Sequence, residues 1–238
     1  MSHALEAVKA VIFDLDDTLY DCSGTLVHSN RLKAAKIVAE AIGCSEKEAY
    51  ELLLTLDKKK TISGDIYEEI ARQHSLPASF LKDIRRTLSD VTISGIKPFE
   101  GVINTLRDLK KRGLVLFLVT VGNREEQEKK IDVLGLRGMF DEIIILDTTV
   151  IGSETKKASF REILDRHDLR PEEVLCVGDR MDRELGVAKE LGIFTVMVKH
   201  GRHYQRFVSN SEGNKKPDMY TESVTELPGI LNIRQPSR

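Results

Sequence analysis

The sequence predicts an α/β protein with a doubly wound parallel sheet and an inserted, all-helical domain. Several short apolar runs are rich in β-branched residues and do not alternate with polar ones, which is typical of strands covered on both faces. Segments whose apolar residues recur at helical spacing separate these runs in the second half of the chain. Such alternation indicates a parallel sheet with helices on both sides.

The predicted strands are five short runs dominated by valine, isoleucine and leucine: residues 8–13, 114–119, 143–146, 174–177 and 193–198. The predicted helices between them cover residues 101–112, 125–134, 159–167 and 183–191. Gly113, Gly135 and Gly192 follow three of these helices, where a left-handed residue often ends a helix. The basic stretch 199–203, after the fifth run, is predicted to be a solvated loop.

Residues 21–96 interrupt the alternation of strands and helices. They contain no strand-like run, and their apolar residues recur at helical spacing, as at Leu32 and Ala35. We expect three to five helices here, forming an inserted domain. Residues 1–20 and 97–238 would then form one discontinuous α/β core.

The composition excludes several functional classes. The chain has 238 residues, with 36 Lys and Arg against 38 Asp and Glu, and no basic stripe that would favour nucleic-acid binding. No apolar run approaches the roughly 20 residues that span a bilayer, and the N-terminus lacks a signal-peptide pattern. Three scattered cysteines argue against a disulfide framework. We therefore expect a cytoplasmic protein that binds neither nucleic acid nor a membrane; the oligomeric state is not predicted.

Two carboxylates follow the first predicted strand. Asp14 and Asp16 are two residues apart, so in an extended chain their side chains leave the same face. Two like charges so close raise each other's pKa unless a cation or a shared proton relieves them. A divalent metal is the simplest relief, and an ordinary acidic turn is the alternative. Asp17 points the other way and is interpreted as structural.

Further polar residues follow the next three predicted strands. Thr120 comes after the second, Lys156 and Lys157 lie in a predicted loop after the third, and Asp179 comes after the fourth, with Glu184 close behind. Each has an ordinary structural explanation when taken alone. Because ligands of open parallel sheets bind beyond the carboxyl ends of the strands, the set together fits a metal-assisted phosphoryl-transfer site.

These residues resemble the four motifs of the haloacid dehalogenase-like superfamily. The run Asp14-Leu15-Asp16-Asp17-Thr18 matches its DxDxT motif. The other three motifs match Thr120, the lysine pair 156–157, and Gly178-Asp179 with Glu184. The resemblance extends from about residue 8 to residue 198 and implies a Rossmann-like core with a helical cap domain of the C1 type.

The resemblance implies a phosphatase that works through an aspartyl-phosphate intermediate. Asp14 would be the nucleophile, and Asp16 would protonate the leaving group and then deprotonate the attacking water. Thr120 would bind a phosphoryl oxygen. Lys156 would neutralise developing charge, and is preferred over Lys157 because Lys157 then becomes an early helix residue. The expected substrate is a small phosphorylated metabolite, since a cap excludes large ones.

The resemblance also implies a Mg²⁺ cofactor. Asp14, the backbone carbonyl of Asp16, and Asp179 would be its protein ligands, with waters and a phosphate oxygen completing the octahedron. Glu184 would orient a metal-bound water rather than bind the metal directly.

Other activities remain open on the sequence. Dehalogenases of the superfamily lack an acid at the second position, so Asp16 favours a phosphatase. A sugar phosphomutase could share every core motif and differ only in the cap. A phospho-accepting receiver-like module also gathers aspartates, a hydroxyl and a lysine, but needs neither Asp16 nor the insertion. The sequence also departs from the superfamily at Val121, where many relatives carry a polar residue, and lacks the common Lys-Pro pair of the third motif.

Overall fold

The computed structural model describes residue 5 and residues 7–59, 65–89, 93–147, 153–209 and 215–231. The chain forms two compact units. One comprises Met1–Asp21 with Ile93–Arg238, and the other comprises Cys22–Thr92. The predicted inserted domain, residues 21–96, contains all of the second unit, and its role as a cap stays a prediction.

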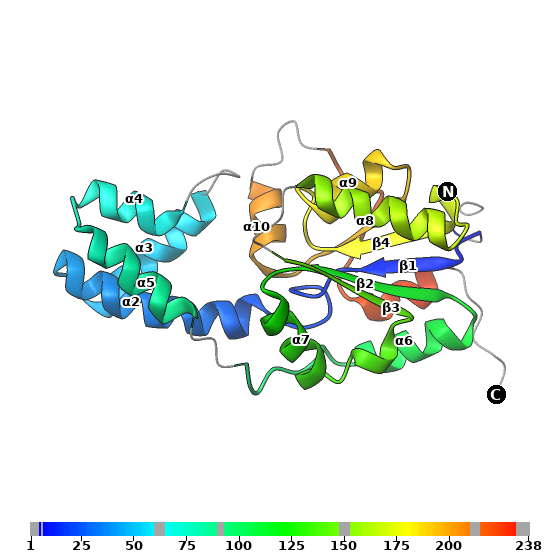
Figure 1. Cartoon of the computed structure of the whole chain (residues 1–238), viewed down its shortest axis with the longest axis horizontal. Coiled ribbons are helices and arrows are strands. Elements are labelled where there is room, and N and C mark those ends of the chain that lie inside the picture. The colour runs from blue at the N-terminus through cyan, green and yellow to red at the C-terminus, as the bar shows by residue number, and fades with distance from the viewer. Residues whose placement is uncertain are drawn as a thin grey trace. The chain divides into compact units, whose positions relative to one another are not determined.

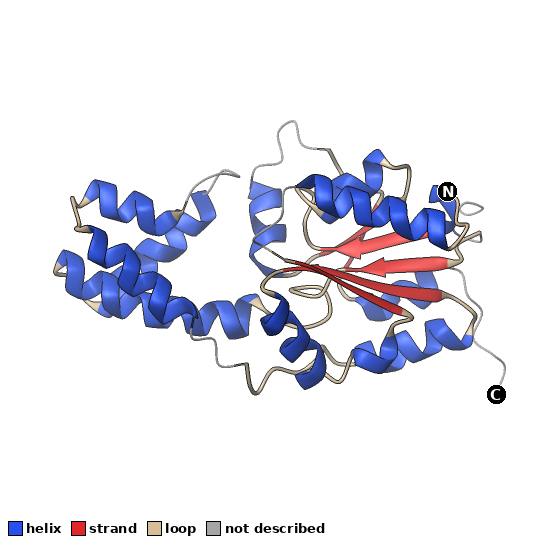
Figure 2. Cartoon of the chain, in the orientation of Figure 1, coloured by secondary structure: helices blue, strands red, loops and turns tan. Residues whose placement is uncertain are grey.

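The first unit is built on a six-stranded, fully parallel sheet with the order β3-β2-β1-β4-β5-β6. Strands of this sheet, red in Figure 2, lie between helices. The strands are β1 (Ala10–Phe13), β2 (Val115–Val121), β3 (Glu142–Leu146), β4 (Val174–Gly178), β5 (Phe194–Val198) and β6 (Met219–Thr221). The first five are the predicted strands, and the α/β fold is confirmed. The sixth was missed because it has only three residues.

The register of the central strands places three chain segments at one edge of the sheet. Phe13, the last residue of β1, lies opposite Leu118 of β2 and Val177 of β4. The next residue, Asp14, continues this pairing, since its backbone N–H donates to the carbonyl of Val177 at 3.0 Å. The residues that follow β1 and β4 and the last residues of β2 therefore lie side by side at the carboxyl ends of the strands.

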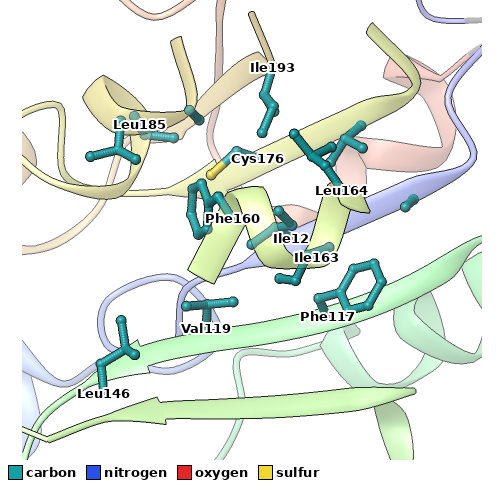
Figure 3. Packing of buried hydrophobic residues seen from close by; sticks show 14 of the residues in the cluster. Ile12, Phe117, Val119, Leu146, Phe160, Ile163, Leu164, Cys176, Leu185 and Ile193 are labelled. Atoms are coloured by element: carbon teal, nitrogen blue, oxygen red, sulfur yellow. The ribbon is translucent and has the colours of Figure 1, made fainter. Parts of the chain in front are cut away.

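The core helices are α6 (Val102–Lys111), α7 (Arg124–Val133), α8 (Ser153–Arg166), α9 (Glu184–Glu190), α10 (Gly201–Ser209) and α11 (Leu227–Ile230). Helices α8 and α9 cover one face of the sheet, and α6 and α7 lie on the other side (Figure 1). On the first face, Phe160 and Ile163 of α8 pack with Ile12, Phe117 and Cys176 of the strands (Figure 3). This apolar packing anchors β1 between its neighbours.

Two helices differ from the prediction. Helix α8 begins at Ser153, six residues before the predicted start, so both candidate lysines lie inside a helix and not in a loop before one. Helix α10 begins at Gly201, within the stretch 199–203 that was predicted to be a solvated loop. Gly201 has a φ of 74°, and a Cβ there would overlap the carboxylate of Asp17. The backbone of Gly201, the first residue of α10, thus lies close against the Asp17 side chain, a contact that sequence spacing does not reveal.

The regular secondary structure of the second unit's described residues is entirely helical. It contains α2 (His28–Ile42), α3 (Glu46–Lys59), α4 (Ile66–Gln73) and α5 (Ala78–Ser89), preceded by a short π-helical turn, η1 (Ser23–Val27). Its own apolar core includes Val38, Leu53, Ile70, Phe80 and Ile84. Across the described parts of the chain, no helix is both long and apolar enough to cross a membrane.

Candidate active site

Three buried carboxylates meet at the carboxyl ends of β1 and β4. Asp14 directly follows β1, Asp179 directly follows β4, and Glu184 is the first residue of α9. One oxygen of each lies within 4.8 Å of the others. Because β1 and β4 are fully buried apolar strands, they deliver these acids to a shielded position. The sequence prediction that Asp14 and Asp179 lie close together agrees with this geometry.

Lys156 of α8 is the cation inside this cluster. Its ammonium lies 3.0 Å from Asp14 Oδ1 and 2.8 Å from Glu184 Oε2, and the residue is 3% exposed. Lys157, the other candidate, lies 2.9 Å from Glu190 at a half-exposed position. The structure therefore places Lys156, and not Lys157, beside Asp14.

Glu184 makes contacts that the sequence did not reveal. Besides accepting from Lys156, it accepts a 2.8 Å hydrogen bond from the backbone N–H of Arg180. A Cβ at Gly178 would lie 2.7 Å from Glu184 Oε1, so a glycine at this position allows the close approach. Glu184 thus contacts both Lys156 and the loop that carries Asp179. The sequence analysis predicted only that Glu184 orients a metal-bound water.

The charges in this cluster perturb one another. Burial raises the pKa of Asp14 to about 7; Lys156 opposes this rise, and the charges of Glu184 and Asp16 add to it. Burial, with Glu184 and Asp14 nearby, raises the pKa of Asp179 well above its ordinary value. Burial alone would lower the pKa of Lys156, but Asp14 and Glu184 more than offset this effect and raise it. If all three acids of the cluster were ionised, they would carry more negative charge than the Lys156 ammonium between Asp14 and Glu184 balances.

This imbalance fits a divalent cation. Asp179 Oδ2 is buried and has no hydrogen-bond partner among the described residues. A buried carboxylate oxygen without a donor is costly unless a cation binds it. Carboxylate oxygens are the ligands that Mg²⁺ prefers, so Asp14 and Asp179 are suited to hold this ion, with Glu184 close enough to contribute.

The carboxylate of Asp16 accepts hydrogen bonds from Tyr20 and Lys130. The hydroxyl of the fully buried Tyr20 lies 2.6 Å from Asp16 Oδ1. The ammonium of Lys130, from α7, lies 3.1 Å from Oδ1 and 3.0 Å from Oδ2. Neither Tyr20 nor Lys130 was a predicted site residue.

Thr120 lies near the end of β2 and is buried. Its hydroxyl accepts a 2.7 Å hydrogen bond from Gln127 Nε2, which also donates to the carbonyl of Val121 at 3.2 Å. Gln127 is another residue that the sequence did not single out. It lies three residues before Lys130 and so on the same face of α7, but nothing in the sequence of this helix marked either residue.

Asp17 has a structural environment of its own. It adopts a left-handed φ of 57°, which aspartate tolerates better than most residues, and its buried carboxylate packs under Gly201. Asp17, Asp21 and His200 also form a second group whose ligand atoms lie within 4.8 Å of one another.

The fold and this site define an α/β protein with a cluster of buried carboxylates, among them Asp14, at the carboxyl ends of β1 and β4. A family model described as haloacid dehalogenase-like hydrolase matches residues 11–198, and the chain belongs to this family. The predicted family and hydrolase class are therefore confirmed.

Named relatives extend over most of the chain. A glyceraldehyde 3-phosphate phosphatase of Methanocaldococcus jannaschii is 28% identical over 227 residues, which cover 94% of this chain and 97% of the relative. A phosphoglycolate phosphatase of Synechococcus elongatus is 25% identical over 194 residues, which cover 82% of this chain and 85% of the relative. The crystal structure of a HAD phosphatase from Thermococcus onnurineus has the same fold, with a TM-score of 0.60 at 23% identity, covering 94% of this chain and 98% of that chain.

Proposed function

We propose that this protein is a Mg²⁺-dependent phosphatase that hydrolyses a small phosphomonoester through an aspartyl-phosphate on Asp14. The observation that carries the proposal is the position of Asp14, beside the buried ammonium of Lys156 and within 4.8 Å of the Asp179 and Glu184 oxygens. The relatives named as phosphatases support the same reaction class.

Asp14 has the properties of a nucleophile in this setting. In the first step its carboxylate oxygen forms a bond to phosphorus while the bond between phosphorus and the ester oxygen breaks. Lys156, 3.0 Å from Asp14 Oδ1, favours the ionised form of the carboxylate against the effect of burial and stabilises the charge that gathers on the phosphoryl oxygens. The Thr120 hydroxyl, held by Gln127, donates to one of these oxygens.

Asp16 supplies the proton transfers. It gives a proton to the departing ester oxygen in the first step. In the second step it removes a proton from water, whose oxygen bonds to phosphorus as the bond from phosphorus to Asp14 breaks. Proton transfer of this kind contributes roughly 100- to 10,000-fold.

Asp14, the backbone carbonyl of Asp16, and Asp179 would hold the Mg²⁺ ion. When bound, the ion neutralises negative charge on the phosphoryl group and orients it toward Asp14. Asp179 Oδ2, which has no hydrogen-bond partner within the described part of the chain, supports this assignment.

We propose a small metabolite as substrate and the helical unit, residues 22–92, as a cap that excludes larger ones. The two phosphatase relatives are named for glyceraldehyde 3-phosphate and phosphoglycolate, which are small phosphomonoesters. Closure of an inserted domain also shields such a reaction from bulk water.

The test is a panel of metabolite phosphomonoesters and a generic aryl phosphate, assayed with Mg²⁺ and with a chelator. The proposal predicts release of inorganic phosphate from at least one small metabolite, loss of that activity with the chelator, and recovery on adding Mg²⁺. Asp14→Asn is the control and should be inactive. Turnover by Asp14→Asn at the rate of the unsubstituted protein would overturn the mechanism, and no turnover on any member of the panel would overturn the function.

A further inference from the structure

Helix α7 brings two buried polar side chains to the edge of the sheet. Gln127 is 1% exposed and Lys130 is 8% exposed, although most of the helix surface around them is polar and solvated. Residues three apart lie on the same helix face. One face of α7 therefore reaches Thr120 through Gln127 and Asp16 through Lys130.

The contact between Lys130 and Asp16 restricts the carboxylate more than an ordinary ion pair. The ammonium lies about equally far from both oxygens, at 3.1 Å and 3.0 Å, while the Tyr20 hydroxyl holds Oδ1 at 2.6 Å. The side chains are 10% exposed for Lys130 and 30% for Asp16. Donors from two chain segments thus fix the carboxylate plane, while part of the carboxylate remains open to solvent.

We propose that Lys130 is a positioning residue for the acid and base Asp16. The inference rests on the proposed function, because Asp16 needs a fixed orientation only if it transfers protons to and from the reacting oxygens. Lys130 acts through Asp16: it holds the carboxylate where the ester oxygen leaves and where the water later attacks. Misplacement of a reacting group by about 1 Å can cost on the order of 100-fold in rate.

The experiment measures kcat/KM for a series of phosphomonoesters whose leaving groups differ in basicity. The value of kcat/KM reports steps up to phosphoryl transfer to Asp14, where an alkoxide needs a proton from Asp16 but a dinitrophenolate does not. We expect Lys130→Met to lower kcat/KM about 10- to 100-fold for alkyl phosphates and by no more than about threefold for dinitrophenyl phosphate. Lys130→Arg should restore at least part of the loss.

Two controls separate a positioning role from a general one. Lys129→Met removes the same charge from the exposed neighbouring position of α7 and should leave the leaving-group dependence unchanged. In an Asp16→Asn background, Lys130→Met should have no further effect on alkyl phosphates, because residues that act as one unit are not additive. Thermal unfolding of each variant shows whether the fold is retained; if Lys130→Met is unfolded, Tyr20→Phe replaces it, with the same pattern expected.

The outcomes also distinguish this inference from the proposed function. An equal loss for all leaving groups, or a full additional loss in the Asp16→Asn background, would overturn the role of Lys130 while leaving the phosphatase assignment intact. An unsubstituted protein with no phosphatase activity would instead overturn the proposed function on which the inference rests.

Discussion

The ammonium of Lys156 lies 3.0 Å from Asp14 Oδ1, although the two residues are 142 positions apart in the chain. The contact joins the end of the central strand to the first part of α8, and it is completed by Glu184 at 2.8 Å. A buried lysine between two carboxylates is fixed in position, and the loss of the lysine would leave two buried carboxylates without the cation between them.

The adjacent lysines give a matched pair of variants. Lys156→Met removes the cation beside Asp14, and we expect kcat/KM to fall by about 1,000-fold, in the range found when one stabilising donor is removed from a catalytic site. Lys157→Met removes a half-exposed lysine paired with Glu190, and its kcat/KM should stay within about twofold of that of the unsubstituted protein. Steady-state kinetics on the best substrate, with unfolding curves for both variants, provides the measurement. A larger loss of kcat/KM in Lys157→Met than in Lys156→Met would contradict the placement of Lys156 in the active site.

The raised pKa values of the buried acids predict how pH affects stability without metal. An unfolded aspartate releases its proton near 3.8, whereas folded Asp14 keeps it up to about 7. Between these values the folded state binds more protons than the unfolded state, so the free energy of unfolding falls as pH rises. In thermal unfolding with a chelator present, the Asp14 carboxyl should therefore lower the stability of the folded protein increasingly from about pH 4 to about pH 7.

Mg²⁺ should reverse this loss, since it binds the ionised carboxylates. At a free concentration about 100 times its Kd, an ion stabilises the folded state by about 3 kcal/mol. The Mg²⁺-induced rise in Tm should be larger near pH 8 than near pH 5. Asp179→Asn should abolish the rise, while Asp165→Asn, at an exposed position of α8, should keep it. An equal Mg²⁺ effect at both pH values would count against the cation site.

Thr120 is expected to bind the phosphoryl group. Thr120→Val keeps the shape of the side chain and removes the hydroxyl, so we expect KM for substrate and the inhibition constant for inorganic phosphate to rise about 10- to 100-fold, as when a hydrogen bond to a charged group is lost. Thr120→Ser keeps the hydroxyl, so its KM and its inhibition constant for phosphate should stay within about threefold of those of the unsubstituted protein. Product-inhibition measurements test this directly, and unchanged phosphate binding in Thr120→Val would exclude the role.

The start of α10 gives a prediction about stability. Gly201→Ala places a methyl group against Asp17 and also strains a φ of 74°, so we expect a loss of about 2–4 kcal/mol in the free energy of unfolding. Gly113→Ala has a similar φ of 83° but no atom within 4 Å of the new Cβ, and should lose only about 1–2 kcal/mol. Denaturant unfolding compares the two. Equal losses would show that the contact with Asp17 does not constrain α10.

The sequence predicted the central strands and the residues that directly follow them. Asp14, Thr120 and Asp179 were proposed as site residues because buried parallel strands are apolar runs and their ends mark the edge where ligands bind; the structure places Thr120 inside β2, near its end. The choice of Lys156 over Lys157 was made from the helix start, and the structure places Lys156 beside Asp14, although α8 starts earlier than predicted.

The supporting residues were not predictable in the same way. Helix α7 reads Arg-Glu-Glu-Gln-Glu-Lys-Lys-Ile-Asp-Val, so nothing in its composition separates the inward Gln127 and Lys130 from their solvated neighbours. The contact of Glu184 with Lys156 and the packing of Asp17 under Gly201 depend on how distant segments meet. Such contacts follow from tertiary packing and leave no periodic signal in the chain.

The most direct test of the central claim is to trap the phosphorylated enzyme. The protein is mixed with substrate and Mg²⁺, quenched in acid within the first turnover, digested, and analysed by mass spectrometry. We expect a phosphoryl group on Asp14 that hydroxylamine removes, as an acyl phosphate requires, and none in Asp14→Asn. A phosphoryl group on another residue, or full turnover by Asp14→Asn, would contradict the proposed mechanism.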